Sequence, residues 1–225
     1  MRKLKMIIPL FFLLLTTQVV YAQVDSCVLK ETVQMKDQIW MTKNLDVTTF
    51  QNGDTILHAP SFESWVAAGK KGIPAWCYYN NDSILGKQLG KIYNWYAAND
   101  KRELAPVGWK VPNFDEVNVF LDFIGRDPYS ADRLASREWT ATGGVDLYGF
   151  RAKPAGSRSI SYNLYSISDT VKDFVGLDWG VGYWMKGPYT KEEGYALLLN
   201  MQEAGAHIYG KKKTDGLYIR CIKKE

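Results

Sequence analysis

The chain has 225 residues, of which 28 are Lys or Arg and 24 are Asp or Glu, and its formal charge is +4. Three of the basic residues lie among the first five positions, so the remainder is almost balanced, with 25 basic and 24 acidic residues. This balance argues against a nucleic-acid-binding surface, which needs many lysines and arginines to neutralise phosphates. The one basic run, at residues 211–213, is interpreted as a solvated turn.

The first 22 residues have the three regions of a secretory signal peptide. Basic residues at positions 2, 3 and 5 precede an apolar run at 6–15, and Val20-Tyr21-Ala22 supplies the cleavage region. We expect cleavage after Ala22 and export to the cell envelope (outer membrane or periplasm) or the extracellular space. Residues 23–225, 203 in number, are the length of one ordinary domain, so a single domain is expected.

Three cysteines allow one disulfide in an exported chain and leave one cysteine over. Cys27 follows the signal closely and is a candidate for lipidation, although Asp25 fits a lipidation motif poorly. Lipidation would leave Cys77 and Cys221 to pair. It is also the one case in which membrane association is expected.

Short strands dominate the predicted elements, with two helices among them. In chain order, a strand is predicted at 38–41 and a helix at 91–99, where Ile92, Trp95 and Tyr96 share one face. Further strands are predicted at 149–153, 183–185, 195–201, 207–209 and 217–222, with turns at Ala204-Gly205 and 211–216. The predicted fold class is therefore α+β.

The stretch LAPVGWKVPNFDEV, residues 104–117, predicts the start of the second helix. Asn113 and Glu116 have the spacing of a capping box. Gly125 is placed to end the helix. The helix would present one apolar face, made by Val117, Phe120, Leu121 and Ile124. We interpret Trp109 as a core plug at the start of this helix, so the stretch is predicted to be scaffold.

Several motifs together resemble the Fibrobacter succinogenes major paralogous domain (FISUMP) family of exported bacterial proteins. They are IWMTKNL (39–45), NGD (52–54), WCYYNND (76–82), GKIYNWYAAND (90–100), APVGWKVPNFDEV (105–117), YGFRAKPAGSR (148–158), YWM (183–185) and LYIRCIK (217–223). The resemblance implies a C-type-lectin-like fold with two helices packed on short antiparallel sheets and a C-terminal β-meander. It also implies that Trp40, Trp76, Trp95, Trp109 and Trp184, which lie in the family motifs, are core residues.

The chain departs from the family pattern at two positions that matter for the cysteines. Family members carry Cys where this chain has Ala105, and His where it has Lys110. The usual partner of Cys221 is therefore missing, and Cys77–Cys221 competes with Cys27–Cys221 as the disulfide. The segment 157–182 matches the family poorly and corresponds to the long loop region in which proteins of this fold bind ligands.

No motif for catalysis or for a cofactor is present. The chain lacks the nucleophile, zinc and phosphate-loop signatures, and the acidic pairs are explained by helix capping and exposed turns. Asp169, Asp173 and Asp178 could coordinate a hard cation such as calcium, but their spacing matches no known loop. We therefore expect no enzymatic activity, no cofactor and no bound metal.

The variable segment is the predicted binding surface. Trp179 and Tyr162 are expected to be exposed stacking platforms, with Asp178 as a polar contact and Tyr183 beside them. The expected function is an exported recognition module for carbohydrate or another envelope component, such as an envelope protein. The alternative is a structural or assembly protein of the envelope without a small-molecule site. An exposed aromatic cleft would favour the first, and a broad apolar patch the second.

Overall fold

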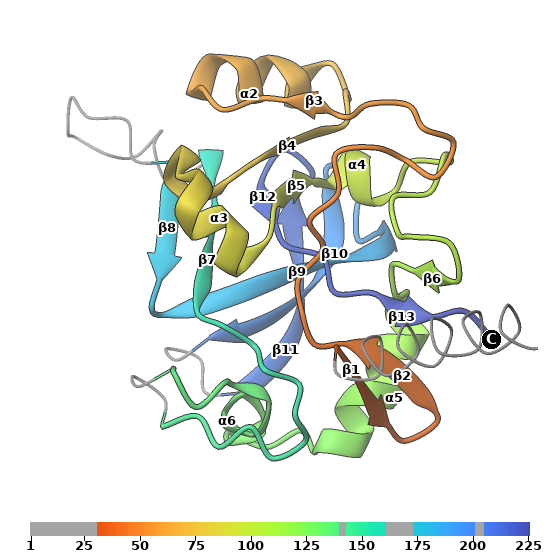
Figure 1. Ribbon diagram of the computed structural model, residues 1–225, viewed down its shortest axis with the longest axis vertical. Helices are drawn as coiled ribbons and strands as arrows, with labels where there is room; N and C mark the ends of the chain where they lie inside the picture. Colours follow the sequence, from red (N-terminus) through yellow and green to blue (C-terminus); the bar gives the residue numbers. More distant parts are fainter. Residues whose placement is uncertain (1–30, 140–142, 161–172, 201–204) are drawn as a thin grey trace, which may run out of the picture. The chain divides into compact units, whose positions relative to one another are not determined.

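The computed structural model describes residues 31–139, 143–160, 173–200 and 205–225 (Figure 1). The helices among them are α2 (Phe62–Lys70), α3 (Ser83–Leu89), α4 (Trp95–Ala98), α5 (Phe114–Ile124) and α6 (Ser130–Leu134), with a 3₁₀ turn η1 (Tyr79–Asn81). The strands are β1 (Thr32–Met35), β2 (Gln38–Met41), β3 (Leu57–His58), β4 (Ala75–Cys77), β5 (Ile92–Asn94), β6 (Trp109–Lys110), β7 (Ala155–Arg158), β8 (Phe174–Leu177), β9 (Gly180–Pro188), β10 (Glu193–Asn200), β11 (Gly205–Lys212), β12 (Gly216–Leu217) and β13 (Ile222–Lys223). This mixture confirms the α+β class.

The described strands form two sheets. The smaller sheet has the order β1-β2-β13-β6. The larger has the order β11-β10-β9-β7-β12-β5-β4-β3, and β8 pairs with β7 outside this path. Its longest strands, β9, β10 and β11, form an antiparallel meander that runs through the middle of the molecule in Figure 1. None of the described helices has the length and apolar content that crossing a membrane requires.

Helix α5 confirms the prediction made from its sequence. Asn113 accepts a hydrogen bond from the Glu116 N–H at 2.9 Å, and Glu116 accepts one from the Asn113 N–H at 2.8 Å, which completes the capping box. The predicted apolar face is buried: Val117, Phe120, Leu121 and Ile124. Gly125 ends the helix with a positive φ of 89°. Trp109 packs against the core from a half-buried position, so it lies at the edge of the core and does not fill it as predicted.

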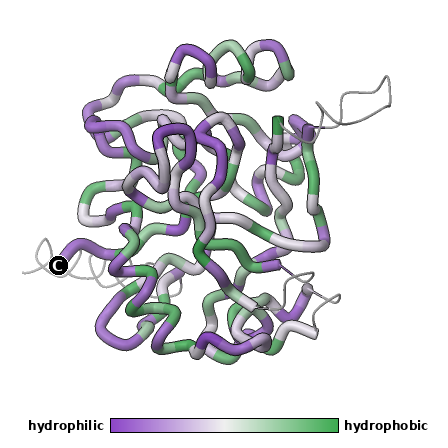
Figure 2. Tube along the Cα trace, turned by 180° about the vertical axis from the view of Figure 1, so that it is seen from behind, coloured by the Kyte–Doolittle hydropathy of each residue, from purple (hydrophilic) through white to green (hydrophobic). Residues whose placement is uncertain are grey.

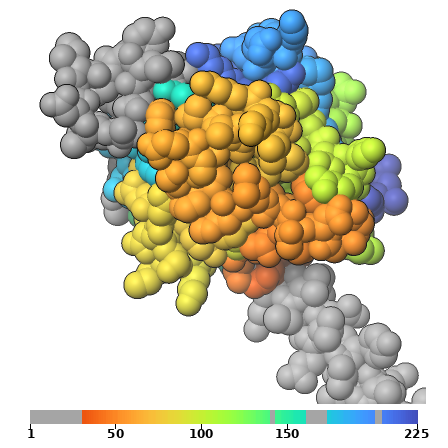
Figure 3. All heavy atoms as spheres, turned by 90° about the horizontal axis from the view of Figure 1, so that it is seen from above, coloured from red at the N-terminus to blue at the C-terminus, as the bar shows by residue number. Residues whose placement is uncertain are grey.

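Helix α2 was not predicted from the sequence. Ser61 caps it, with its hydroxyl accepting a hydrogen bond from the Ser64 N–H at 3.1 Å. Trp65 anchors it, because the buried indole donates a hydrogen bond to the Thr214 carbonyl at 2.8 Å. Both polar and apolar residues occur along α2 in Figure 2, as expected for a helix with one buried face. Figure 3 shows it in orange, beside α3 in yellow.

Two other predictions differ from the structure. Residues 91–99 were predicted as one helix, but β5 occupies Ile92–Asn94 and the helix is limited to α4. Asn94 decides the boundary, because its side chain accepts a hydrogen bond from the Ala97 N–H at 3.0 Å and caps α4 from an extended conformation. Residues 149–153 form no strand; the segment makes an isolated bridge between Ala152 and Ala135.

The C-terminal meander confirms the predicted strands at 183–185, 195–201 and 207–209, apart from Met201, which lies outside the described residues. The strand predicted at 217–222 is divided into β12 and β13, which belong to different sheets. The turn predicted at 211–216 is confirmed but is shorter, because β11 extends to Lys212 and β12 begins at Gly216. Ala204 lies outside the described residues.

The core consists of two clusters on opposite faces of the sheet. Cys77 and Ile92 face each other across β4 and β5 and belong to the first cluster, whereas the neighbouring pair Trp76 and Tyr93 belongs to the second. Cys221 lies in the second cluster. Because adjacent residues of a strand face opposite sides, the sheet separates the two thiols.

The expected disulfide between Cys77 and Cys221 is therefore not formed, and both cysteines are free and buried. Burial raises the pKa of each thiol to about 12, which keeps both protonated. Cys27 lies outside the described residues.

Most of the predicted core tryptophans are buried. Trp40, Trp76 and Trp184 belong to the two core clusters, while Trp95 and Trp109 are half-buried. Trp40 packs against Phe120 of α5, with the ring centroids 4.7 Å apart, and so joins the smaller sheet to the helix.

Candidate functional site

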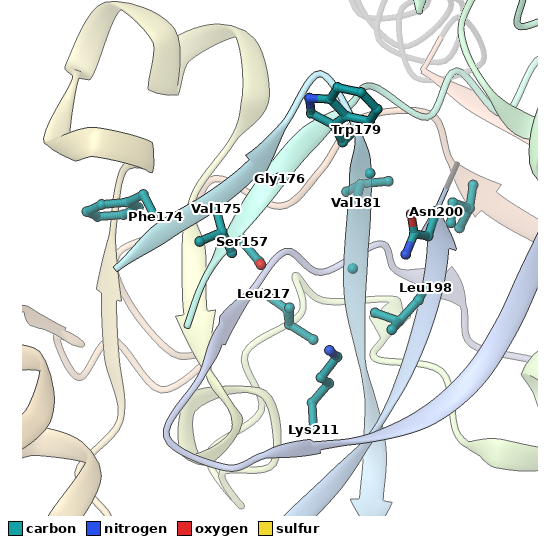
Figure 4. A pocket seen from close by; sticks show the side chains of 14 residues that line it. Ser157, Phe174, Val175, Gly176, Trp179, Val181, Leu198, Asn200, Lys211 and Leu217 are labelled. Atoms are coloured by element: carbon teal, nitrogen blue, oxygen red, sulfur yellow. The ribbon is translucent and has the colours of Figure 1, made fainter. Parts of the chain in front are cut away.

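A hollow of about 510 Å³ lies where the β7–β8 hairpin diverges from the meander of β9, β10 and β11. Among the residues that the structure describes, β7 and β9 are paired through Gly156 and Val181 alone, so the two groups of strands part beyond this contact. The apolar walls of the hollow come from Phe174, Val175, Leu198 and Leu217 (Figure 4). The volume falls in the range of about 300 to 1,000 Å³ that is usual for small-molecule sites.

Glycines shape the floor of the hollow. Gly182 faces Leu198 across β9 and β10, and a Cβ atom at Gly182 would come within 2.8 Å of the Leu217 side chain and 2.9 Å of the Leu198 side chain. A larger residue would therefore displace both leucines, which line the hollow. Gly156 has a φ of +68°, and a Cβ atom there would lie 2.5 Å from the Val175 carbonyl oxygen. These glycines allow the strands to approach closely and still leave a depression beside them.

Trp179 stands at the rim of the hollow, on the tight turn between β8 and β9. Its backbone N–H donates to the Gly176 carbonyl at 3.0 Å, and the turn requires a left-handed residue at Asp178, where φ is 67°. Asp is one of the non-glycine residues that tolerate this conformation. The Trp179 side chain is 57% exposed and lines the hollow, as the sequence predicted. Figure 4 shows its ring at one end of the hollow.

Three polar side chains line the hollow away from Trp179: Ser157, Asn200 and Lys211. The Ser157 hydroxyl and the Asn200 amide come from opposite walls, and Lys211 rises at the end opposite the Trp179 ring (Figure 4). Lys211 faces Gly194 across β10 and β11, and it is the only charged lining residue that the structure describes. Lys211 belongs to the basic run at 211–213, which was interpreted from the sequence as a solvated turn. This run therefore contributes a positively charged side chain to the hollow.

The family comparison bears directly on this part of the chain. Residues 33–223 match the model of the Fibrobacter succinogenes major domain. The chain belongs to this family. No curated protein and no solved structure matches the chain. The match includes the hollow and β7 to β11, so the Fibrobacter succinogenes major domain of this chain carries the site.

Two predicted site residues of this family member do not take the expected roles. Tyr183 is buried, because it follows Gly182 in β9 and so faces the core, where its ring packs against Phe150 with centroids 6.2 Å apart. Asp178 is exposed and does not line the hollow; it forms the turn that presents Trp179. Tyr162 lies outside the described residues.

The three aspartates considered as cation ligands are not a described cluster. Asp173 is buried and paired with Arg158, with Nε and Oδ2 2.6 Å apart, and Asp178 lies beyond the other end of β8. Asp169 lies outside the described residues. Within the described ranges, no group of three His, Cys, Asp or Glu side chains could hold a metal ion.

Arg158 holds the wall of the hollow in place. Its guanidinium also donates to the carbonyl oxygens of Ala59 at 2.9 Å and Pro60 at 3.1 Å. The group lies over the rings of Trp65 and Phe174, at 4.8 and 4.7 Å from their centroids. Buried charges need such compensation. The ion pair thereby fixes the β7–β8 hairpin against the segment before α2.

Sequence reasoning missed a second hollow, beside α5 and the edge strand β11. Its volume is about 370 Å³, and its lining includes Phe114, Asn118, Arg126, Tyr189, Tyr195 and Tyr209. The rings of Tyr189 and Tyr195 meet edge to face with centroids 5.2 Å apart, and Phe114 lies 4.9 Å from Tyr195. The sequence signal for this hollow was the series of tyrosines along the C-terminal meander. The sequence alone does not show that these tyrosines lie beside Phe114.

Proposed function

We propose that the protein is an exported, non-catalytic recognition module that binds carbohydrate in the hollow beside Trp179. The observation that carries the proposal is a 57% exposed indole at the rim of a hollow that also contains a hydroxyl, an amide and an ammonium group. A sugar presents an apolar face of C–H groups and a periphery of hydroxyls. The indole suits the first, and the groups of Ser157, Asn200 and Lys211 suit the second.

Export and a non-catalytic role are part of this proposal and rest on the sequence. The basic, apolar and cleavage regions of residues 1–22 support export, and the missing catalytic motifs support binding without turnover. We also propose the C-type-lectin-like architecture implied by the family resemblance. A mature N-terminus at Gln23, found by mass spectrometry of the secreted or envelope form, supports the export route. If the mature chain instead starts at an acylated Cys27, the protein is anchored to the membrane by a lipid.

The second hollow supports an alternative role as a structural or assembly protein of the envelope. Tyr189 is 51% exposed there, and Phe114 and Tyr209 are each 40% exposed, so the hollow offers aromatic contact area to a protein partner. This alternative places the interaction at α5 and β11 instead of the β8–β9 turn.

Binding of the chain to an array of plant and bacterial saccharides tests the proposal. Trp179→Ala is expected to weaken binding at least about tenfold, because the stacking surface is lost while the turn remains. Tyr189→Ala is the matched control, since it removes a similarly exposed ring from the second hollow. Equal binding by the Trp179 variant and the unchanged chain contradicts the proposed site. If saccharide binding is lost only in the Tyr189 variant, the binding site is the second hollow.

A further inference from the structure

Lys211 gives the hollow a charge asymmetry, whereas the proposed function uses its ammonium only as a hydrogen-bond donor to sugar hydroxyls. Lys211 lies near the end of β11. It is on the same face of the meander as Leu198 of β10, which also lines the hollow. Its ammonium forms no ion pair with any residue that the structure describes. Lys91 and Lys110, by contrast, pair with Asp46 and Glu116. A half-buried lysine without a carboxylate partner is suited to bind an anion.

The opposite end of the hollow, at Trp179, has no charged residue among its described lining. Asp178 forms the turn that presents Trp179 and does not line the hollow, whereas Lys211 lies at the far end from the indole (Figure 4). An anionic group is therefore attracted to the Lys211 end, and the Trp179 end offers an uncharged stacking surface. The arrangement favours a ligand whose neutral ring lies against Trp179 and whose negative group reaches Lys211.

Other charges near Lys211 do not remove this asymmetry. Asp215 is buried and accepts a hydrogen bond from the Ile160 N–H at 3.3 Å. It does not line the hollow, and it forms no ion pair with Lys211. Lys212, the next residue, is exposed and faces the other side of β11, because neighbouring residues of a strand alternate.

We infer that the hollow selects acidic saccharides, with Lys211 binding the carboxylate of a uronic acid and Trp179 stacking on a sugar ring. This inference rests on the proposed function, because it specifies the ligand class of the same site. Ser157 and Asn200 lie between the two ends and are placed to bind sugar hydroxyls. The lysine ammonium offers three hydrogen-bond donors to the carboxylate and its neighbouring hydroxyls.

Matched neutral and acidic oligosaccharides test the inference. Titration calorimetry of the chain with oligogalacturonate, its methyl ester and a sulfated oligosaccharide gives the preference directly. We expect oligogalacturonate to bind at least about tenfold more tightly than the methyl ester. Lys211→Gln is expected to abolish that difference, because it should weaken the binding of oligogalacturonate at least about tenfold more than the binding of the methyl ester. Lys211→Arg should keep most of the preference because it keeps the charge.

Lys212→Gln is the matched control, because it removes the adjacent charge from the other face of the same strand. Equal losses in the Lys211 and Lys212 variants mean non-specific attraction and overturn the inference. Equal binding of the acid and its ester, with both lost in Trp179→Ala, overturns it and leaves the proposed function standing. If neither saccharide binds, the proposed function fails for this ligand group. Tighter binding of the sulfated ligand overturns the assignment of a carboxylate.

Discussion

Asp215 is a buried acid whose titration should be visible in the stability of the protein. Burial raises its pKa from 3.8 to about 6, although the Ile160 N–H and the charges of Lys211 and Lys212 oppose the rise. The folded state therefore holds this proton more tightly than the unfolded state does. The resulting stability is fully present below about pH 4 and is lost as the pH rises through about 6.

Asp215→Asn should thus stabilise the protein at neutral pH and have little effect in acid. The amide keeps an oxygen that accepts the Ile160 N–H and carries no charge to desolvate. At pH 7.5 we expect a gain of up to about 3 kcal/mol in the free energy of unfolding, which shrinks towards zero at pH 4. Urea unfolding at pH 4, 5, 6 and 7.5 measures it. A constant difference for Asp215→Asn across this range contradicts the assignment.

At the scale of elements, α5 depends on its cap for part of its stability. The Asn113 side chain satisfies the Glu116 N–H, and Glu116 in return binds the Asn113 N–H and pairs with Lys110 at 2.5 Å. Asn113→Ala should reduce the free energy of unfolding by about 1 kcal/mol, and Asn113→Asp, which keeps the capping oxygen, should reduce it by much less. Chemical denaturation of the three chains makes the comparison. Equal losses in both variants would show that the cap is not the cause.

The same stretch shows what local sequence can and cannot predict. The capping box and the spacing of Val117, Phe120, Leu121 and Ile124 lie within a dozen residues, and each was confirmed. The burial of Trp109 depends on how β6 meets β13, a pairing more than a hundred residues away in the chain, and the sequence alone overestimated it. Trp109→Ala should accordingly cost less than the about 3 to 5 kcal/mol expected for a fully buried tryptophan.

The candidate site was predicted in part for a similar reason. Trp179 could be expected at an exposed turn because it lies in the segment that departs from the family pattern. Lys211 was missed because its position beside Leu217 and Leu198 follows from the pairing of β9, β10 and β11. Tyr183 was misplaced because a strand's two faces cannot be assigned until its neighbours are known. Local signals therefore predicted elements, and non-local strand pairing decided which side chains form the hollow.

At the scale of the whole described unit, the two core clusters should unfold together. β9 contributes Tyr183 and Met185 to the first cluster and Trp184 to the second, while β10 contributes Leu199 to the first and Ala196 to the second. Neither cluster can lose its packing without disturbing strands that support the other. We therefore expect one cooperative transition for residues 33–225, with the hollow lost in the same step.

Fluorine NMR of chains labelled with fluorotryptophan can follow each cluster separately. The signals of Trp40, in the first cluster, and Trp184, in the second, should disappear at the same urea concentration. Leu199→Ala removes buried atoms only from the first cluster and should cost about 2 to 5 kcal/mol, because it leaves a cavity. It should lower the midpoint of both signals equally. A Trp184 signal that persists after the Trp40 signal has gone would show that the second cluster folds independently and that the shared strands do not couple the two.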